Sequence, residues 1–169
     1  MRPRSLAWIL ALVWFVWLAG LQQGLAESER FARATPDLVT VLFVSLAGAV
    51  RRSDLALLAL FAALARKTFS LDPPSAILAG SFALAALAWT LRAFVDIRSP
   101  LWRAALAAFG AAGIALWLEV VRAARERAVD VAPDLGLAGH AAWTSALAAL
   151  ALGGLLAFLP GLSPLRSKR

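Results

Sequence analysis

The sequence of 169 residues contains no cysteine, no tyrosine and a single histidine, His140. The absence of cysteine excludes disulfide bonds, thiol catalysis and cysteine-ligated iron–sulfur clusters. A zinc site needs a set of several ligands, usually His or Cys, and one histidine cannot supply it. The sequence also lacks a Gly-rich phosphate loop and the Gly-x-Ser-x-Gly motif of hydrolases. We therefore expect a protein that is not an enzyme and holds no metal or cofactor, with His140 as an interfacial residue.

Charged residues are also scarce, at 16% of the chain, while hydrophobic residues make up 62%. An average soluble domain has about 25% charged and about 45–50% apolar residues. A soluble globule of this composition would lack the polar residues to cover its surface, so the composition predicts an integral membrane protein. The formal charge is +7, and the basic residues stand at the ends of apolar runs. This placement indicates contact with membrane lipid headgroups and no nucleic-acid partner.

A transmembrane helix needs about 20 mostly apolar residues. We predict one polytopic domain over residues 1–169, an all-α bundle with six spans at about 6–26, 36–50, 54–71, 75–95, 101–121 and 138–159. The third run is uninterrupted only over residues 55–65, and it crosses fully only if Arg66 and Lys67 extend toward the headgroups. Five spans therefore remain an alternative, as does removal of the first run as a signal peptide after Ala26.

Three of the expected helices begin with a polar residue followed by proline: Thr35–Pro36, Asp72–Pro73 and Ser99–Pro100. The polar side chain is suited to cap free backbone N–H groups, and proline has no N–H to leave unpaired at the first helical position. Asp37 adds a negative charge to the first turn of the second helix, where it interacts favourably with the helix dipole. We therefore assign Pro36 and Asp37 a structural role at this helix start.

The distribution of Lys and Arg predicts the orientation in the membrane. With a cytoplasmic N-terminus and six spans, ten of these residues fall on the cytoplasmic side and seven on the opposite side. Positive residues favour the cytoplasmic side of a membrane. We therefore expect both termini to be cytoplasmic.

Small residues repeat every four positions in the last expected span, at Ser145, Ala149, Gly153 and Ala157. Such a row lets helix backbones approach closely where lipid offers no hydrophobic driving force. These four residues are the candidate helix-packing face.

Charged residues stand near the ends of the expected spans and not at their centres, which disfavours ion-coupled transport. Those at helical spacing are expected to pair along their own helix. Arg92 is four residues from Asp96, and Arg122 is within four residues of Glu119 and Glu126.

Residues 35–52, TPDLVTVLFVSLAGAVRR, resemble the second span of the MreD family of bacterial rod-shape-determining proteins. The match consists of a Pro36-Asp37-Leu38 start, an apolar span and a basic stop at Arg51 and Arg52. The segment LRAFVDIRSPLWRAAL, residues 91–106, resembles the family's connection between its fourth and fifth spans. The third segment departs from the pattern, because it lacks the family's glycines and carries Arg66 and Lys67.

The resemblance implies a non-enzymatic, multi-pass subunit of the cell-elongation complex in the bacterial inner membrane. Members of the family work with MreC, MreB, RodA and a penicillin-binding transpeptidase, and they help to position peptidoglycan synthesis. No catalytic residue of the family exists to be transferred to this chain. The family's fold is also similar to the substrate-binding subunits of energy-coupling-factor transporters.

Two other functions stay open. The first is a substrate-binding membrane subunit of a vitamin or small-molecule transporter, which would need a concave pocket with converging polar groups. Its candidate residues are Gln22, Gln23, Thr68 and Asp72. The second is a membrane enzyme that acts on lipid-linked substrates, for which the acids are too scattered.

Overall fold

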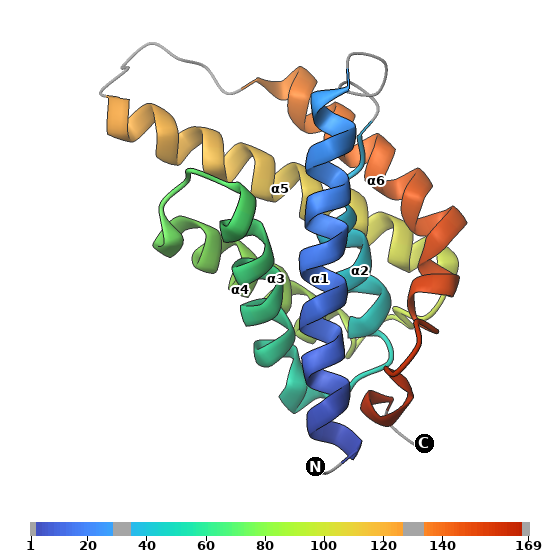
Figure 1. The fold of residues 1–169 in the computed structure, drawn as a ribbon. Helices are drawn as coiled ribbons and strands as arrows, with labels where there is room; N and C mark the ends of the chain where they lie inside the picture. The colour runs from blue at the N-terminus through green and yellow to red at the C-terminus, as the bar shows by residue number, and fades with distance from the viewer. Residues whose placement is uncertain (1–2, 29–34, 127–133, 167–169) are drawn as a thin grey trace.

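A computed structural model describes residues 3–28, 35–126 and 134–166. These residues form helices and connecting segments, and no strand occurs among them. The α-helices are α1 (Pro3–Glu27), α2 (Leu38–Ala47), α3 (Leu55–Phe69), α4 (Pro74–Leu91), α5 (Pro100–Glu126) and α6 (Leu135–Leu156), with short 3-10 helices η1 (Arg52–Asp54) and η2 (Ser163–Leu165). The prediction of an all-α chain is confirmed (Figure 1).

Four of the helices in the described part of the chain are long and apolar enough to cross a membrane. They are Arg4–Glu27 within α1, together with α4, α5 and α6. The chain therefore has the character of a helical membrane protein. The two remaining helices, α2 and α3, have 10 and 15 residues and fall short of the length of a span.

Helix α2 lies at the centre of the bundle, and all ten of its residues are buried. At about 1.5 Å per residue it covers roughly half of a hydrocarbon core about 30 Å thick. The expected span over residues 36–50 is thus a shorter helix that ends at Ala47. From the sequence alone, its continuous apolar run predicts a membrane crossing. In the structure, the run is explained by burial on all sides among the other helices of the chain.

Helix α1 places one face on this core and leaves the other outside. Ala7, Ala11 and Phe15, four residues apart, are buried, whereas Val13 and Trp17 are more than half exposed. The buried face contacts α3 and α2. The first helix is therefore an integral part of the packed bundle, with an apolar outer stripe suited to lipid.

The helices after α3 alternate in direction, and α5 crosses the bundle obliquely (Figure 1). Helix α5 begins at Pro100, as expected from Ser99–Pro100, and makes its most extensive contact with α6. The start of α1 and the segment leading to Arg166 lie at the same end of the bundle (Figure 1). This end also receives the C-terminal ends of α2 and α6.

Three expected local arrangements near the helix ends are wrong. Helix α2 begins at Leu38 with Asp37, and not Thr35, as its N-cap, so Pro36 precedes the helix and Asp37 is not in its first turn. Helix α4 begins at Pro74 with Pro73 as its N-cap, so Asp72 does not cap it. It ends at Leu91, and the residues after it no longer have helical spacing. Arg92 therefore does not pair with Asp96, and instead donates to the carbonyl of Val50 at 2.9 Å.

Candidate functional site

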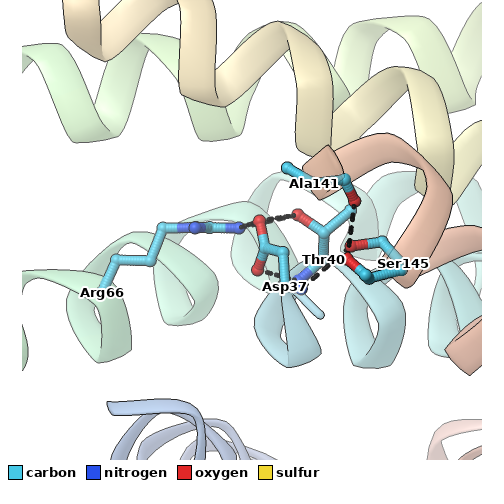
Figure 2. A network of polar contacts seen from close by, with 6 residues as sticks. Asp37, Thr40, Arg66, Ala141 and Ser145 are labelled. Carbon is cyan, nitrogen blue, oxygen red and sulfur yellow. Dashed lines mark hydrogen bonds and ion pairs between the residues drawn. The ribbon is translucent and has the colours of Figure 1, made fainter. Parts of the chain in front are cut away.

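Asp37 is the N-cap of α2, and its carboxylate forms hydrogen bonds with the side chains of Thr40 and Arg66 (Figure 2). Its carboxylate accepts the backbone N–H of Thr40 at 3.0 Å and the Thr40 hydroxyl at 2.8 Å. Arg66, near the end of α3, donates from Nη2 to Asp37 Oδ2 at 2.5 Å and to Thr40 Oγ1 at 2.6 Å. The backbone N–H of Asp37 donates to Ser145 Oγ of α6 at 2.9 Å. One helix cap therefore connects α2, α3 and α6.

The Asp37–Arg66 pair is largely inside the protein. The side chains of Arg66 and Asp37 are 13% and 10% exposed. Removing one partner of a buried pair leaves an uncompensated charge, which costs about 3–5 kcal/mol. Arg66 thus does not extend toward lipid headgroups, as expected from the sequence, because the carboxylate of Asp37 offers it a partner inside the bundle.

A second ion pair lies nearby, between the α3–α4 connection and α5. Arg122 binds both carboxylate oxygens of Asp72, with its Nε and Nη2 atoms at 2.7 and 2.8 Å. Asp72 is 6% exposed, and Ser70 Oγ also donates to it at 2.8 Å. The hydrogen bonds from Arg122 hold the pKa of the Asp72 carboxyl below its usual value, although burial acts in the opposite direction.

The partner of Arg122 differs from the expected one. Sequence spacing suggested Glu119 and Glu126, whereas the hydrogen bonds run to Asp72. Lys67 also has partners within the chain: its Nζ atom donates to the carbonyls of Ser70 and Asp72 at 3.1 and 3.0 Å. We call Asp37, Arg66, Asp72 and Arg122 together the paired end of the bundle.

A pocket of about 490 Å³ opens at the paired end. Its polar lining includes Gln22, Gln23, Arg66, Asp72 and Arg122. The Gln22 Oε1 and Arg66 Nε atoms are buried and have no hydrogen-bond partner among the described residues. The side chains of Gln22 and Arg66 thus line the pocket with hydrogen-bonding capacity that no described residue uses.

Three of the four polar residues considered for a transport site thus line one pocket, and they come from two distant segments of the chain. Thr68 is separate, and its hydroxyl donates to the carbonyl of Leu64 at 3.1 Å. The arginines were not among those candidates. Because Asp37 starts the second helix and Arg66 ends the third, the alternation of helix direction would have placed them at the same end.

The small-residue row of α6 faces the interior over most of its length. Ser145, Ala149 and Gly153 are buried, and Ala157 is half-buried just after the helix. A Cβ on Gly153 would lie 2.6 Å from Arg103 Nε and 3.1 Å from Ser45 Oγ. The row therefore lets α2 and α5 approach α6 closely. Pro36, for its part, precedes the Asp37 cap.

No group of three or more His, Asp and Glu side chains suited to a metal ion occurs in the described ranges. His140 is exposed in the first half of α6. The acids Asp37 and Asp72 bind arginines of the same chain. The paired end therefore has a pocket with charged and hydrogen-bonding side chains, which can bind a polar ligand.

Comparison of the chain with protein-family models gives no match, and no curated protein or solved structure is significantly similar to it.

Proposed function

We propose that this protein is a non-enzymatic membrane subunit of the bacterial cell-elongation complex, as its resemblance to the MreD family implies. In this proposal it lies in the inner membrane, with cytoplasmic termini and six helices that reach across or into the bilayer. It binds MreC, RodA, the penicillin-binding transpeptidase and MreB, and it helps to position peptidoglycan synthesis and maintain rod shape. It acts through binding energy alone, since membrane helix contacts that include polar groups contribute roughly 0.6–2 kcal/mol each.

An apolar groove between α4 and α5 is the observation that carries this proposal. Its volume is about 360 Å³, and its lining includes Ala79, Gly80, Ala83, Gly110 and Gly113. Small residues are the usual contact points of associating membrane helices. Ala79, Ala83 and Gly113 are exposed in the groove. The groove therefore suits one occupant in particular, a transmembrane helix of a partner in the complex.

The three glycines of this groove have different surroundings. A Cβ on Gly80 would lie 3.3 Å from Trp117, and one on Gly110 would lie 2.8 Å from Leu84, so these two keep α4 and α5 in contact. A Cβ on Gly113 would meet no atom of the described residues within 4 Å, so this position faces open space. A side chain at position 113 would fill the groove without disturbing the bundle.

A pull-down of the tagged protein in mild detergent, followed by mass spectrometry, tests the proposal. We expect the wild type to recover MreC, RodA or the transpeptidase. The Gly113→Leu variant should recover at least about tenfold less, because the added side chain occupies the groove; about 1.4 kcal/mol is tenfold in binding. Gly139→Leu in α6, which also meets open space, is the matched control and should recover the wild-type amount.

The possible outcomes test separately whether the protein belongs to the complex and whether the groove is its binding site. If the wild type recovers none of these proteins, the elongation-complex proposal is wrong. If Gly113→Leu recovers as much partner as the control, the complex stands but the groove is filled by lipid or by nothing. Both variants must elute as monodisperse protein on size exclusion for this comparison.

The pocket at the paired end favours a second candidate function, the substrate-binding subunit of a small-molecule transporter. Its volume of about 490 Å³ lies in the usual range of ligand pockets. Recovery of an ATPase pair with a coupling membrane protein, in place of MreC, would support it. We would then expect a bound small molecule in the wild type and a lower occupancy in Gln22→Leu, since Gln22 Oε1 is buried without a partner among the described residues.

A further inference from the structure

We propose that the end of the bundle opposite the Asp37 cap binds the phosphate group of an anionic membrane lipid. A second polar pocket, of about 270 Å³, lies there, where the C-terminal ends of α2 and α6 meet the start of α5. Its lining includes three arginines, Arg98, Arg103 and Arg166, which we call the arginine end. The proposal does not depend on the function proposed above.

The positions of two of these arginines are fixed by helix-terminal carbonyls. Arg98 Nε donates to the carbonyl of Gly48 at 2.8 Å, and Arg166 Nη2 donates to that of Ala157 at 2.7 Å. The Arg166 guanidinium also lies 3.9 Å from the centre of the Phe158 ring. A guanidinium has five N–H groups, so each of these side chains keeps further donors for a ligand.

Among the described residues, no ion pair balances the charge of the arginine end. The ion pairs among the described residues are Arg4–Asp54, Arg66–Asp37 and Arg122–Asp72, and none involves the three arginines of this pocket. The nearest acid in sequence, Asp96, accepts from the backbone N–H of Arg98.

Among the three arginines of this pocket, Arg103 is the one with an unpaired buried donor. Its Nε atom is buried and has no hydrogen-bond partner in the described part of the chain. The absence of a side chain at Gly153 makes room for it, since a Cβ there would lie 2.6 Å from this atom. An unpaired buried donor is costly, and the Arg103 side chain, which lines the pocket, would gain an acceptor from an anion there.

The chemistry of the pocket favours a phosphate with an attached acyl chain. The planar fork of arginine matches two phosphate oxygens, and basic pockets between membrane helices bind anionic headgroups. Apolar side chains at the pocket are exposed: the lining residue Phe158 and the nearby Leu155 are each 70% exposed, and Leu101 is 75% exposed. Acyl chains would lie on this surface, whereas inorganic phosphate shares only the headgroup contacts.

Native mass spectrometry of the purified full chain in a neutral detergent tests the proposal. The probes are phosphatidylglycerol, phosphatidylcholine and inorganic phosphate, added separately. We expect phosphatidylglycerol to bind at least about tenfold more tightly than phosphatidylcholine. In the Arg98→Gln/Arg103→Gln double variant, its affinity should fall at least about tenfold, because hydrogen bonds to charged groups are lost.

Arg51→Gln is the matched control, because Arg51 is exposed near the same end of α2 but does not line the pocket. It should bind phosphatidylglycerol within about twofold of the wild type. Equal binding of the two lipids by the wild type would overturn the proposal even if the double variant failed to fold. Equal binding by the folded double variant would also overturn it. Displacement of the lipid by millimolar inorganic phosphate would overturn the assignment to a lipid.

Discussion

The arginines of the paired end and the three of the arginine end are held in opposite ways, although Arg4, at the start of α1, pairs with Asp54. At the paired end, Arg66 and Arg122 each bind a carboxylate from a distant part of the chain. At the arginine end, Arg98 and Arg166 bind backbone carbonyls just beyond α2 and α6, and Arg103 has a buried Nε without a partner among the described residues. The first arrangement pairs each arginine with a carboxylate, whereas the second leaves three arginines without a carboxylate partner among the described residues.

This difference predicts a different role for each set of arginines. A buried acid–arginine pair is strongly coupled, so its loss is felt as lost stability. An arginine that binds a helix-terminal carbonyl interacts favourably with the negative end of the helix dipole. Its positive charge is not neutralised by this contact. We therefore expect substitutions of the paired charges to act on folding, and substitutions of the three arginines of the arginine end to act on binding.

The largest effect is expected from breaking the Asp37–Arg66 pair. Arg66→Leu leaves the Asp37 carboxylate buried without its cation, so the free energy of unfolding should fall by about 3 kcal/mol. Unfolding in detergent micelles, followed by circular dichroism, measures it. Arg125→Leu, an exposed arginine in the last turn of α5, is the control and should change it by less than about 0.5 kcal/mol.

A second substitution sharpens this prediction. Asp37→Asn combined with Arg66→Leu removes both charges, and the double variant should recover part of the lost stability. A double variant that is less stable than Arg66→Leu alone would show that the cap of α2, and not the ion pair, is the main contribution of Asp37.

An intermediate effect is expected where α6 passes the arginine end. Gly153→Ala places a methyl group 2.6 Å from Arg103 Nε, so the side chain must move, at a cost of about 1–2 kcal/mol in unfolding free energy. Gly154→Ala meets no atom within 4 Å and should stabilise the helix slightly. If the two alanine variants are equally stable, α6 does not approach Arg103 as closely as described.

The smallest effect is expected at the second pair, because Arg122 is half exposed to its surroundings. Asp72→Asn should lower the free energy of unfolding by about 1 kcal/mol near neutral pH. Because the folded-state pKa of Asp72 lies below its usual value of 3.8, this stabilisation is complete above that value and is lost as the pH falls through the folded-state pKa.

The pH dependence provides the measurement for this pair. The difference in unfolding free energy between wild type and Asp72→Asn should shrink as the pH is lowered below about 4. A difference that stays constant down to the lowest pH at which the protein folds would mean that the Asp72–Arg122 pair does not stabilise the fold.

Local features of the fold could be predicted from the sequence, whereas long-range pairs could not. The all-helical class follows from apolar runs, and the start of α2 follows from the Pro36–Asp37 sequence, although Asp37 itself is the cap. The buried position of α2 could not be separated from a membrane crossing, because both need a continuous apolar run. The error at Arg92 and Asp96 has a local cause, since helical spacing ends with α4 at Leu91.

Only some residues of the paired end could be predicted from the sequence. The sequence suggests Gln22, Gln23 and Asp72 as one polar set, whereas it predicts that Arg66 extends toward headgroups and that Arg122 pairs with neighbours on its own helix. Their real partners lie 29 and 50 residues away, so no local spacing rule could identify them. Only the three-dimensional arrangement of the helices brings these charges together.

The most direct test of the account is whether the two ends lie on opposite sides of a membrane. The chain has no cysteine, so a single introduced cysteine can be labelled without background. Leu71, 99% exposed near Asp72, and Phe94, 79% exposed in the turn after α4, are suitable positions. We predict that a membrane-impermeant maleimide labels Leu71→Cys in intact cells and labels Phe94→Cys only after the membrane is permeabilised. Labelling of both variants in intact cells, or the reverse pattern, would contradict the account.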